Sequence, residues 1–365
     1  MIDLSVNINK KNLTYAIHIS NEDVEKLRDT VLNEIDNKNY VLVISERVHK
    51  LYSKRLNFQK EKTFILKDGE VEKNQKNYEK ILDFALKNKL KREDAIIAIG
   101  GGVVGDIAGF AASTYMRGIN LVQIPTTLLA MTDSSVGGKV AINTKYGKNL
   151  IGAFYQPKAV YINTNFIKTL DENQFKSGMG EILKYGFIEK SCVTDAQFNL
   201  LNFLTENFEK ILSRDLLTLE ELIRLCVSIK IAVVEQDEKE SGLRKILNFG
   251  HTYGHVVETL TGYKKYTHGQ CVVEGINFAL KIAHNLNFID KEYKFLCEDL
   301  IKKFGYNPLQ KFELSKIISI MTSDKKATEN YIKFILPTGY ATVTEKEFTP
   351  QEISNLLKIL QQYSN

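Results

Sequence analysis

The stretch Ala95-Ile-Ile-Ala-Ile-Gly-Gly-Gly-Val-Val-Gly-Asp106 decides the fold of the N-terminal half of the chain. Residues 95–99 form an apolar run that is too short and too rich in β-branched side chains for a helix, so they are predicted to be a buried strand. The apolar spacing that follows predicts a helix beginning near Val103. At such a glycine turn, backbone N–H groups can approach a pyrophosphate closely, although glycines also serve tight strand-to-helix packing.

Short apolar runs on both sides of this stretch extend the pattern. Four further strands are predicted at residues 40–45, 63–66, 121–124 and 159–162. Residues 70–90 carry apolar side chains at three- and four-residue spacing, which is typical of a surface helix. Because strands and helices alternate, the sequence predicts an α/β domain with a mostly parallel sheet over residues 1–169.

The pattern changes near residue 169. Long amphipathic segments predict helices at residues 216–235, 268–287 and 291–304, and a late hairpin is predicted over residues 331–344. The sequence therefore predicts a second, α-helical C-terminal domain over residues 170–365.

The composition excludes several classes of protein. The 365 residues include 49 Lys and Arg against 44 Asp and Glu, and no basic arm follows a nucleic-acid backbone. No uncharged apolar stretch approaches the ~20 residues that span a bilayer, and residues 1–12 lack an apolar signal core. The four cysteines include no Cys-x-x-Cys pair, which favours free thiols. We therefore expect a cytoplasmic protein that binds neither nucleic acid nor a membrane.

Polar side chains follow two predicted strands at their carboxyl ends, where open α/β sheets bind ligands. Asp68 and Glu70 follow the run at 63–66, and Thr126 follows the run at 121–124. Acidic side chains at this edge can accept hydrogen bonds from ribose hydroxyls, which favours a dinucleotide site. Taken singly, Asp68 is typical of a turn and Thr126 of a helix cap.

Residues 133–149 are predicted to be a polar loop, because apolar side chains are scarce there. Lys139, Lys148 and Asn149 supply cationic and amide donors that suit a phosphate or a carboxylate. Upstream, the planar guanidinium of Arg117 could hold an oxyanion. A solvated lysine or a surface salt bridge is the ordinary alternative for each of these residues.

Candidate metal ligands gather in the C-terminal half. His251 and His255 are four residues apart, which places them on one face of a predicted helix. Together with His268 and a carboxylate they could form a zinc site, and three protein ligands would leave one position open for substrate. The candidate carboxylate is Glu181, with Lys184 one turn later. Hydrogen-bonded histidines and a surface ion pair are the alternatives.

Taken together, these segments resemble the sugar-phosphate cyclase superfamily, and most closely its 3-dehydroquinate synthase family. The resemblance covers nearly the whole chain. Its motifs occur in the family's order at residues 68–73, 100–106, 115–118, 125–143, 147–149, 181–186 and 242–255. It implies a Rossmann-like N-terminal domain that holds NAD, a helical C-terminal domain that holds a divalent metal (zinc or cobalt), and a homodimer. One departure is Gly180, where the family usually has alanine; a glycine there is expected to loosen the helix.

The resemblance also implies the residues of the site. The metal ligands would be Glu181, His251 and His268, so that His255 lies on the substrate side. NAD would be held by Asp68, Glu70, Lys73, Gly101, Gly102, Gly105, Asp106, Thr126, Thr127, Asp133, Lys139 and Lys148. Substrate binding and catalysis would use Asp133, Lys139, Asn149, Lys184, Lys230, Arg244, Asn248 and His255, together with Arg117 from the neighbouring subunit and Lys325 or Lys326.

The implied activity is the conversion of 3-deoxy-D-arabino-heptulosonate 7-phosphate to 3-dehydroquinate and phosphate, a step of the shikimate pathway to the aromatic amino acids. Two other enzymes remain as alternatives: a cyclase similar to 2-deoxy-scyllo-inosose synthase and a metal-dependent polyol dehydrogenase. A cyclase whose substrate lacks a carboxylate would gain little from Arg244, and a dehydrogenase would leave NADH in solution. A non-catalytic dinucleotide sensor would have no evident use for Glu181, His251 and His268.

Overall fold

The computed structural model describes residues 1–8, 13–192, 198–310, 312–323 and 331–362, which divide into two compact units. The first unit comprises Met1–Asp171 and Arg214–Glu238. The second comprises Glu172–Ser213 and Lys239–Asn365. The first division lies close to the predicted boundary between residues 169 and 170, but the return of residues 214–238 to the first unit was not predicted.

A seven-stranded sheet lies at the centre of the first unit, as far as the described residues show, with the strand order β1-β2-β9-β6-β5-β3-β4. Its strands are β1 (Ile2–Ile8), β2 (Leu13–Ser20), β3 (Tyr40–Ser45), β4 (Thr63–Leu66), β5 (Ala95–Gly100), β6 (Asn120–Pro125) and β9 (Ala159–Asn163). Every pair is parallel except β1 with β2. The predicted α/β class with a mostly parallel sheet is therefore confirmed.

Strands β1 and β2 were not predicted. Unlike β3 and β5, which are buried at every residue, they alternate buried with more exposed positions. A strand that is covered on one face alternates polar and apolar side chains, so it contains no continuous apolar run of the kind that identified the central strands.

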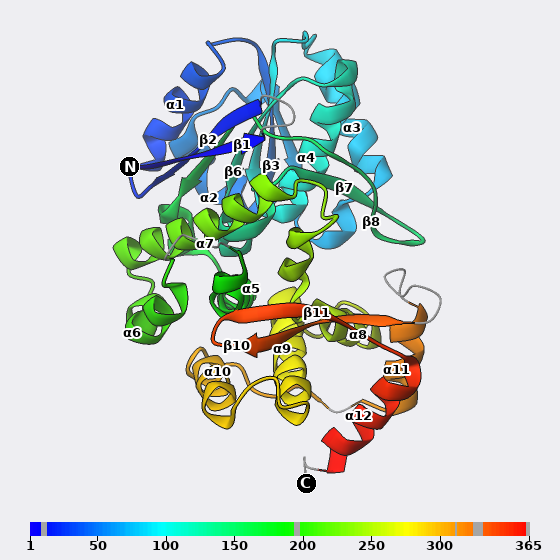
Figure 1. The fold of residues 1–365 in the computed structure, drawn as a ribbon. Coiled ribbons are helices and arrows are strands. Elements are labelled where there is room, and N and C mark those ends of the chain that lie inside the picture. The colour runs from blue at the N-terminus through cyan, green and yellow to red at the C-terminus, as the bar shows by residue number, and fades with distance from the viewer. Residues whose placement is uncertain (9–12, 193–197, 311, 324–330, 363–365) are drawn as a thin grey trace. The chain divides into compact units, whose positions relative to one another are not determined.

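Helices cover the sheet. They are α1 (Leu27–Glu34), α2 (Glu46–Leu56), α3 (Gln75–Lys87), α4 (Gly102–Thr114) and α7 (Leu216–Gln236). Figure 1 shows α3 and α4 together on one side of the strands. There Val41 and Val43 of β3 and Ile96 of β5 pack with Ile81 of α3 and Ile107 of α4, and all five side chains are buried. This apolar layer fixes the start of α4 directly after the glycine turn that ends β5.

The prediction of a polar loop over residues 133–149 is wrong. The segment instead begins with the last two residues of a π-helical turn (Ala130–Ser134) and includes most of an antiparallel hairpin, β7 (Lys139–Thr144) with β8 (Gly147–Phe154). Val140 and Ile142 are buried in the apolar layer that contains α4. A few apolar residues at period two are enough to anchor a strand whose remaining side chains are polar, which the scarcity of apolar residues concealed.

Helix α7 packs in the first unit against β1, β2 and the π-helical turn. Its Glu235 accepts a hydrogen bond from the backbone N–H of Asn7, 2.7 Å away. The amphipathic pattern predicted the helix correctly. The pattern did not show which of the two units the apolar face of the helix packs against, because a period of 3.6 residues identifies the apolar face but not the element that covers it.

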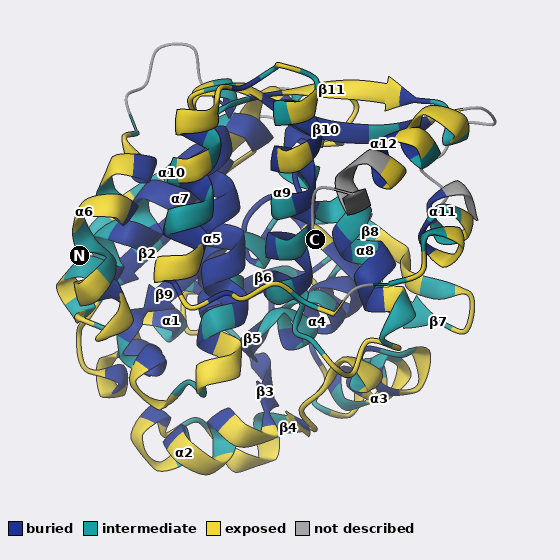
Figure 2. Cartoon of the chain, turned by 90° about the horizontal axis from the view of Figure 1, so that it is seen from below, coloured by how far each residue is buried: buried dark blue, intermediate teal, exposed yellow. Residues whose placement is uncertain are grey.

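The second unit is mainly helical. Its elements are α5 (Glu172–Cys192), α6 (Leu200–Leu212), α8 (His251–Leu260), α9 (His268–Asn285), α10 (Lys291–Lys303), α11 (Leu314–Ser323), α12 (Pro350–Gln362) and the antiparallel hairpin of β10 (Ile332–Gly339) and β11 (Thr342–Phe348). Helix α5 is buried along most of its length (Figure 2). Among the described helices, none combines the length and apolar character needed to cross a membrane.

Backbone contacts between helices α5, α8 and α9 depend on glycine. An ideal Cβ on Gly180 of α5 would lie 2.4 Å from the carbonyl oxygen of Gly269 in α9. One on Gly275 of α9 would lie 1.8 Å from the carbonyl oxygen of Gly250, which directly precedes α8. Gly180 was expected to loosen its helix; in the structure it allows α5 and α9 to touch. These contacts lie beside the predicted metal ligands.

Candidate active site

The three predicted metal ligands converge within the second unit. Glu181 lies in α5, while His251 and His268 are the first residues of α8 and α9. Glu181 Oε1 lies 3.2 Å from His268 Nε2 and 3.5 Å from His251 Nε2, and the three ligand atoms lie within 4.8 Å of one another. A tetrahedral zinc ion with bonds of ~2.1 Å would hold its ligand atoms about 3.4 Å apart. The observed spacing fits one such cation.

The carboxylate at the centre of this group is deeply buried. Glu181 is 1% exposed, and within the part of the chain that the structure describes neither of its oxygens makes a hydrogen bond of acceptable geometry. The ammonium group of Lys184, one turn later in α5, forms an ion pair with it. A buried carboxylate is costly unless it is fully partnered, so the unsatisfied oxygens support a cation at this position.

The electrostatics favour the protonation states that two of the ligands need. Burial alone would raise the pKa of Glu181, but Lys184 and the two histidines outweigh it and lower that pKa below its ordinary value. Burial lowers the pKa of His251. Burial also acts to lower the pKa of His268, but Glu181 and Glu258 raise it overall. A charged Glu181 and a neutral His251 are ready to bind metal, whereas His268 must lose a proton first.

Each histidine also has a partner for its other ring nitrogen. His251 Nδ1 lies 3.1 Å from the carbonyl oxygen of Phe249. A carbonyl can only accept, so Nδ1 carries the hydrogen and the lone pair is on Nε2, which faces Glu181. His268 Nδ1 lies 3.0 Å from Glu258 Oε1. The sequence analysis missed Glu258, although its position seven residues after His251 places it on the same face of α8.

Three predicted substrate residues lie on neighbouring segments of the second unit. Arg244, which is buried, and Asn248 belong to the short 3-10 helix Leu243–Asn248. Asn248 Nδ2 donates to Glu240 Oε1 over 2.6 Å, and the sequence analysis also missed Glu240. The ring centroid of His255 lies 5.4 Å from that of His251, so His255 stands beside the three ligands without joining them.

The glycine turn of the first unit has the geometry of an anion site. Strand β5 ends at Gly100, and α4 begins at Gly102 without a side chain that caps its first turn. Such an uncapped helix start can receive a phosphate. The backbone N–H of Thr126 donates to the Gly100 carbonyl over 2.9 Å, and an ideal Cβ on Gly101 would lie 3.0 Å from Thr127 Cγ2. The predicted residues Gly101, Gly102, Thr126 and Thr127 therefore meet at the carboxyl edge of the sheet.

An ion pair between a buried lysine and a partly buried aspartate lies beside this turn. Lys73 Nζ is 2.7 Å from Asp106 Oδ2 and 3.6 Å from Glu70 Oε1, and Asn143 Nδ2 donates to the same oxygen of Glu70 over 2.7 Å. Burial acts to lower the pKa of Lys73, but Asp106 and Glu70 outweigh it and raise that pKa. Burial raises the pKa of Asp106. The structure thus brings together three of the predicted NAD residues, with Gly105 beside Asp106 in α4.

Two further predicted residues pair within the first unit. Lys230 Nζ of α7 lies 2.7 Å from Asp133 Oδ1 and also donates to the backbone carbonyl of Asp133. Asp133 belongs to the π-helical turn Ala130–Ser134, and such turns occur frequently at functional sites. The return of α7 to the first unit is what creates this pair.

The remaining predicted residues are more scattered. Lys139, Lys148 and Asn149 are exposed on the β7–β8 hairpin, and the backbone N–H of Asn149 donates to Asn143 Oδ1 over 3.0 Å. Arg117 is exposed, with a positive φ of 68°. The Asp68 side chain accepts from the backbone N–H of Arg47 near the start of α2. Lys325 and Lys326 lie outside the described residues.

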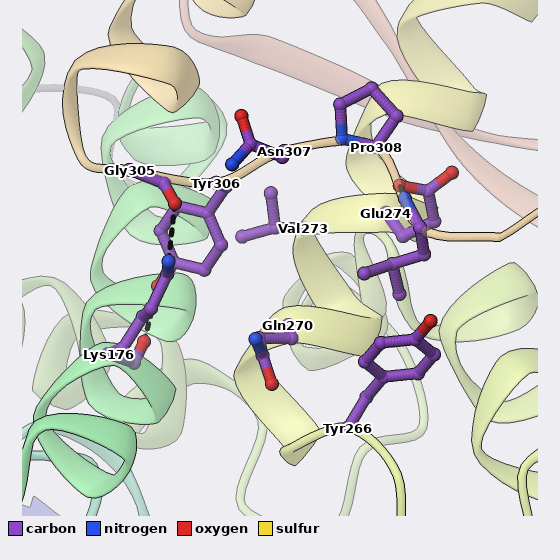
Figure 3. A pocket seen from close by; sticks show the side chains of 10 residues that line it. Lys176, Tyr266, Gln270, Val273, Glu274, Gly305, Tyr306, Asn307 and Pro308 are labelled. Carbon is purple, nitrogen blue, oxygen red and sulfur yellow. Dashed lines mark hydrogen bonds between the residues drawn. The ribbon is translucent and has the colours of Figure 1, made fainter.

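A cavity of about 180 Å³ lies elsewhere in the second unit (Figure 3). Lys176 donates to the carbonyl oxygen of Gly305, and the hydroxyl of Tyr306 donates to the carbonyl of Lys176. Glu274 accepts from the backbone N–H of Leu309 over 3.2 Å. None of the predicted site residues that the structure describes lines the cavity, and its volume is below the ~300 Å³ at which ligand pockets begin. We assign it no function.

Comparisons with known proteins identify the family of the chain. A family model described as 3-dehydroquinate synthase N-terminal matches residues 63–177, and one described as 3-dehydroquinate synthase C-terminal matches residues 178–327. The chain is 44% identical over 322 residues to a 3-dehydroquinate synthase of Alkaliphilus metalliredigens (strain QYMF), covering 87% of this chain and 88% of that protein. It is 40% identical over 363 residues to one of Thermoanaerobacter sp. (strain X514), covering 97% and 99%.

Solved structures show the same fold. A crystal structure of 2-deoxy-scyllo-inosose synthase complexed with carbaglucose-6-phosphate, NAD+ and Co2+ superposes with a TM-score of 0.83 at 24% identity, covering 98% of this chain and 100% of that chain. A 2-epi-5-epi-valiolone synthase from Streptomyces hygroscopicus subsp. jinggangensis 5008, with NAD+ and Zn2+ bound, also gives 0.83, at 21% identity and with 96% and 98% covered. At these identities the likeness concerns the fold.

Proposed function

The chain belongs to the 3-dehydroquinate synthase family, and we propose that it converts 3-deoxy-D-arabino-heptulosonate 7-phosphate to 3-dehydroquinate and inorganic phosphate. The observation that carries this proposal is the convergence of Glu181, His251 and His268, whose ligand atoms lie within 4.8 Å of one another. Three protein ligands leave room for a substrate oxygen, as in catalytic zinc sites. The relatives at 40–44% identity support this reaction over that of other cyclases.

We further propose that the first unit binds NAD and the second a divalent cation, zinc or cobalt. The cyclases of similar fold were solved with NAD+ and with Co2+ or Zn2+, which supports both. When bound, these groups supply a reversible hydride acceptor for the C5 hydroxyl of the substrate and a Lewis acid for its oxygen. Gly101, Gly102, Thr126 and Thr127 would surround the pyrophosphate, and Glu70, Lys73 and Asp106 the remainder of the dinucleotide.

The substrate would be held by cations and amides in each unit. In the second unit, the buried guanidinium of Arg244 can pair with the substrate carboxylate in a bidentate manner, and Asn248 and His255 can donate hydrogen bonds. In the first unit, Lys139 and Asn149 would hold the phosphate, with Arg117 from the neighbouring subunit, while Lys230 and Asp133 would contact the sugar. Lys184 is a further proposed substrate contact, whereas Asp68 and Lys148 are proposed contacts of the NAD.

In the proposed reaction, oxidation at C5 makes the C6 proton acidic. That proton leaves, the bond between C7 and the phosphate oxygen breaks, and inorganic phosphate departs. Re-reduction at C5 would restore both the hydroxyl group and the hydride acceptor, so the overall conversion would involve no net redox change. Ring opening and intramolecular aldol closure give the carbocycle. Donors that hold the departing phosphate stabilise the negative charge that develops on it. Because a carbon–oxygen bond breaks by elimination, the proposed enzyme class is a carbon–oxygen lyase.

One assay tests the proposal. The metal-loaded protein is incubated with NAD+ and the heptulosonate phosphate, and phosphate and NADH are both measured. We expect phosphate release without accumulated NADH. NADH without phosphate would identify a polyol dehydrogenase. His268→Ala removes a ligand and should abolish turnover; a fully active variant would exclude His268 from the metal site.

We also propose a homodimer in the cytoplasm. The exposed apolar side chains of β8 support a self-association surface in the first unit, since Leu150 and Ile151 are 44% and 47% exposed. All four cysteines are buried and free of disulfides, which supports a reducing compartment.

A further inference from the structure

The imidazole of His268 lies between two carboxylates of the second unit. Its Nε2 faces Glu181, 3.2 Å from Oε1, and its Nδ1 faces Glu258, 3.0 Å from Oε1. Glu181 belongs to α5, His268 begins α9, and Glu258 lies near the end of α8. Three helices are thus connected through one ring. The two contacts fix both the position of the ring and the direction in which each nitrogen points.

The burial of the Glu258 carboxylate is energetically unfavourable. Its side chain is 7% exposed, and a carboxylate so far out of water is destabilising unless it has a strong partner. Glu258 stands seven residues after His251, two helical turns along the same face of α8. One helix face therefore presents a metal ligand at one end and the partner of another ligand at the other.

From this geometry we propose that Glu258 is a positioning residue for the metal site, which rests on the metal binding proposed above. By accepting the Nδ1 hydrogen of His268, it holds the tautomer whose Nε2 lone pair points at the cation and makes that nitrogen more basic. The backbone carbonyl of Phe249 has the same role for His251. A carboxylate beyond a histidine ligand contributes about 10- to 100-fold in metal affinity.

The test measures metal affinity directly. The dissociation constants of Zn2+ and Co2+ are determined by chelator competition on the metal-free full chain, for wild type, Glu258→Gln and Glu258→Ala. We expect Glu258→Ala to weaken binding about 10- to 100-fold. Glu258→Gln should fall between the two, because its amide oxygen still accepts from Nδ1 but carries no charge. The visible absorption of Co2+ bound to Glu258→Ala should also change, since His268 is no longer held in place.

Glu274→Gln is the matched control. Glu274 is a largely buried carboxylate of α9. Its oxygen accepts a hydrogen bond from the backbone N–H of Leu309, which is not one of the proposed metal ligands. Its variant should bind metal as wild type does, and urea unfolding of each metal-free variant reports any general loss of stability. Affinity of Glu258→Ala within twofold of wild type would overturn the proposal, as would equal weakening by Glu274→Gln. A wild-type chain that binds neither metal would instead refute the proposed function itself.

Discussion

At the scale of the residue, the most consequential side chains are charged groups removed from water. Lys73 is buried against Asp106 in the first unit, and Glu181 is buried against Lys184 in the second. Desolvation makes such pairs poor contributors to stability unless every partner is present. They persist where a ligand needs preset charges, which is why they mark candidate sites.

Removing one member of the first pair tests its burial. Lys73→Met leaves the Asp106 carboxylate without its cation, so we expect the free energy of unfolding to fall by about 3–5 kcal/mol near neutral pH. Urea denaturation measures it. The control is Lys67→Met, which removes an exposed lysine of the same unit and should change stability by less than about 0.5 kcal/mol.

The stability difference between Lys73→Met and wild type should shrink at both ends of the pH range. The pKa of Lys73 is raised above 10.5 in the fold, so its contribution is present below about pH 10.5 and is lost as pH rises through the folded value. The pKa of Asp106 is also raised, so protonation favours the fold as pH falls through that value, and the variant recovers. Denaturation curves at acid, neutral and alkaline pH measure this. A difference that is independent of pH would contradict it.

In the second unit, Glu181→Gln keeps the shape of the ligand but removes its charge. We expect loss of bound Zn2+ and of turnover, because an amide oxygen is a poor substitute for a carboxylate ligand, and the Lys184 ammonium is left without its counter-charge. Metal content after dialysis, measured by atomic emission, checks this against wild type. Retention of one equivalent of metal would contradict it.

At the scale of the element, glycine decides how closely the helices that hold the ligands approach. The Gly250–Gly275 contact lets α9 pack directly on the start of α8, next to His251. A methyl group there has no free space, because its neighbour is backbone that a rotamer change cannot move.

We therefore expect Gly275→Ala to destabilise the protein by about 1–3 kcal/mol, or more if α9 cannot shift, and to weaken metal binding. Urea denaturation and chelator competition measure the two effects. Gly262→Ala is the comparison: its φ is 62° and nothing lies within 4 Å of the added carbon, so only backbone strain of about 1–2 kcal/mol is expected, with unchanged metal affinity. If Gly275→Ala were as stable as wild type, the backbone at Gly250 and Gly275 would be able to move apart to accommodate the methyl group.

At the scale of the whole molecule, we expect the chain to form a homodimer through strand β8. Strand β8 is exposed along most of its length, and its surface carries the apolar side chains of Leu150, Ile151 and Phe154, with Ile151 on the opposite face of the strand from the other two. Ile151→Asp places a charge on this surface, so we expect a dimeric wild type to become monomeric at micromolar concentration, with loss of activity as Arg117 of the neighbouring subunit is removed.

Light scattering after size exclusion measures the mass. Leu217→Asp, at a 69% exposed leucine of α7, should leave the dimer intact. Dimeric Ile151→Asp would place the interface elsewhere, and a monomeric wild type would refute the homodimer.

The sequence alone was sufficient for the alternation of strand and helix and for the glycine turn at residues 100–102, because local periodicity and residue chemistry specify these features. It also supplied the candidate metal ligands, but the choice of Glu181, His251 and His268 among them came from the resemblance to a known family. The sequence was not sufficient for strands β1 and β2, the β7–β8 hairpin, the return of α7 to the first unit, or the pairing of Glu258 with His268. These depend on which faces are covered and which helices touch. Such contacts join residues distant in the chain, and only the packing of the folded chain determines them.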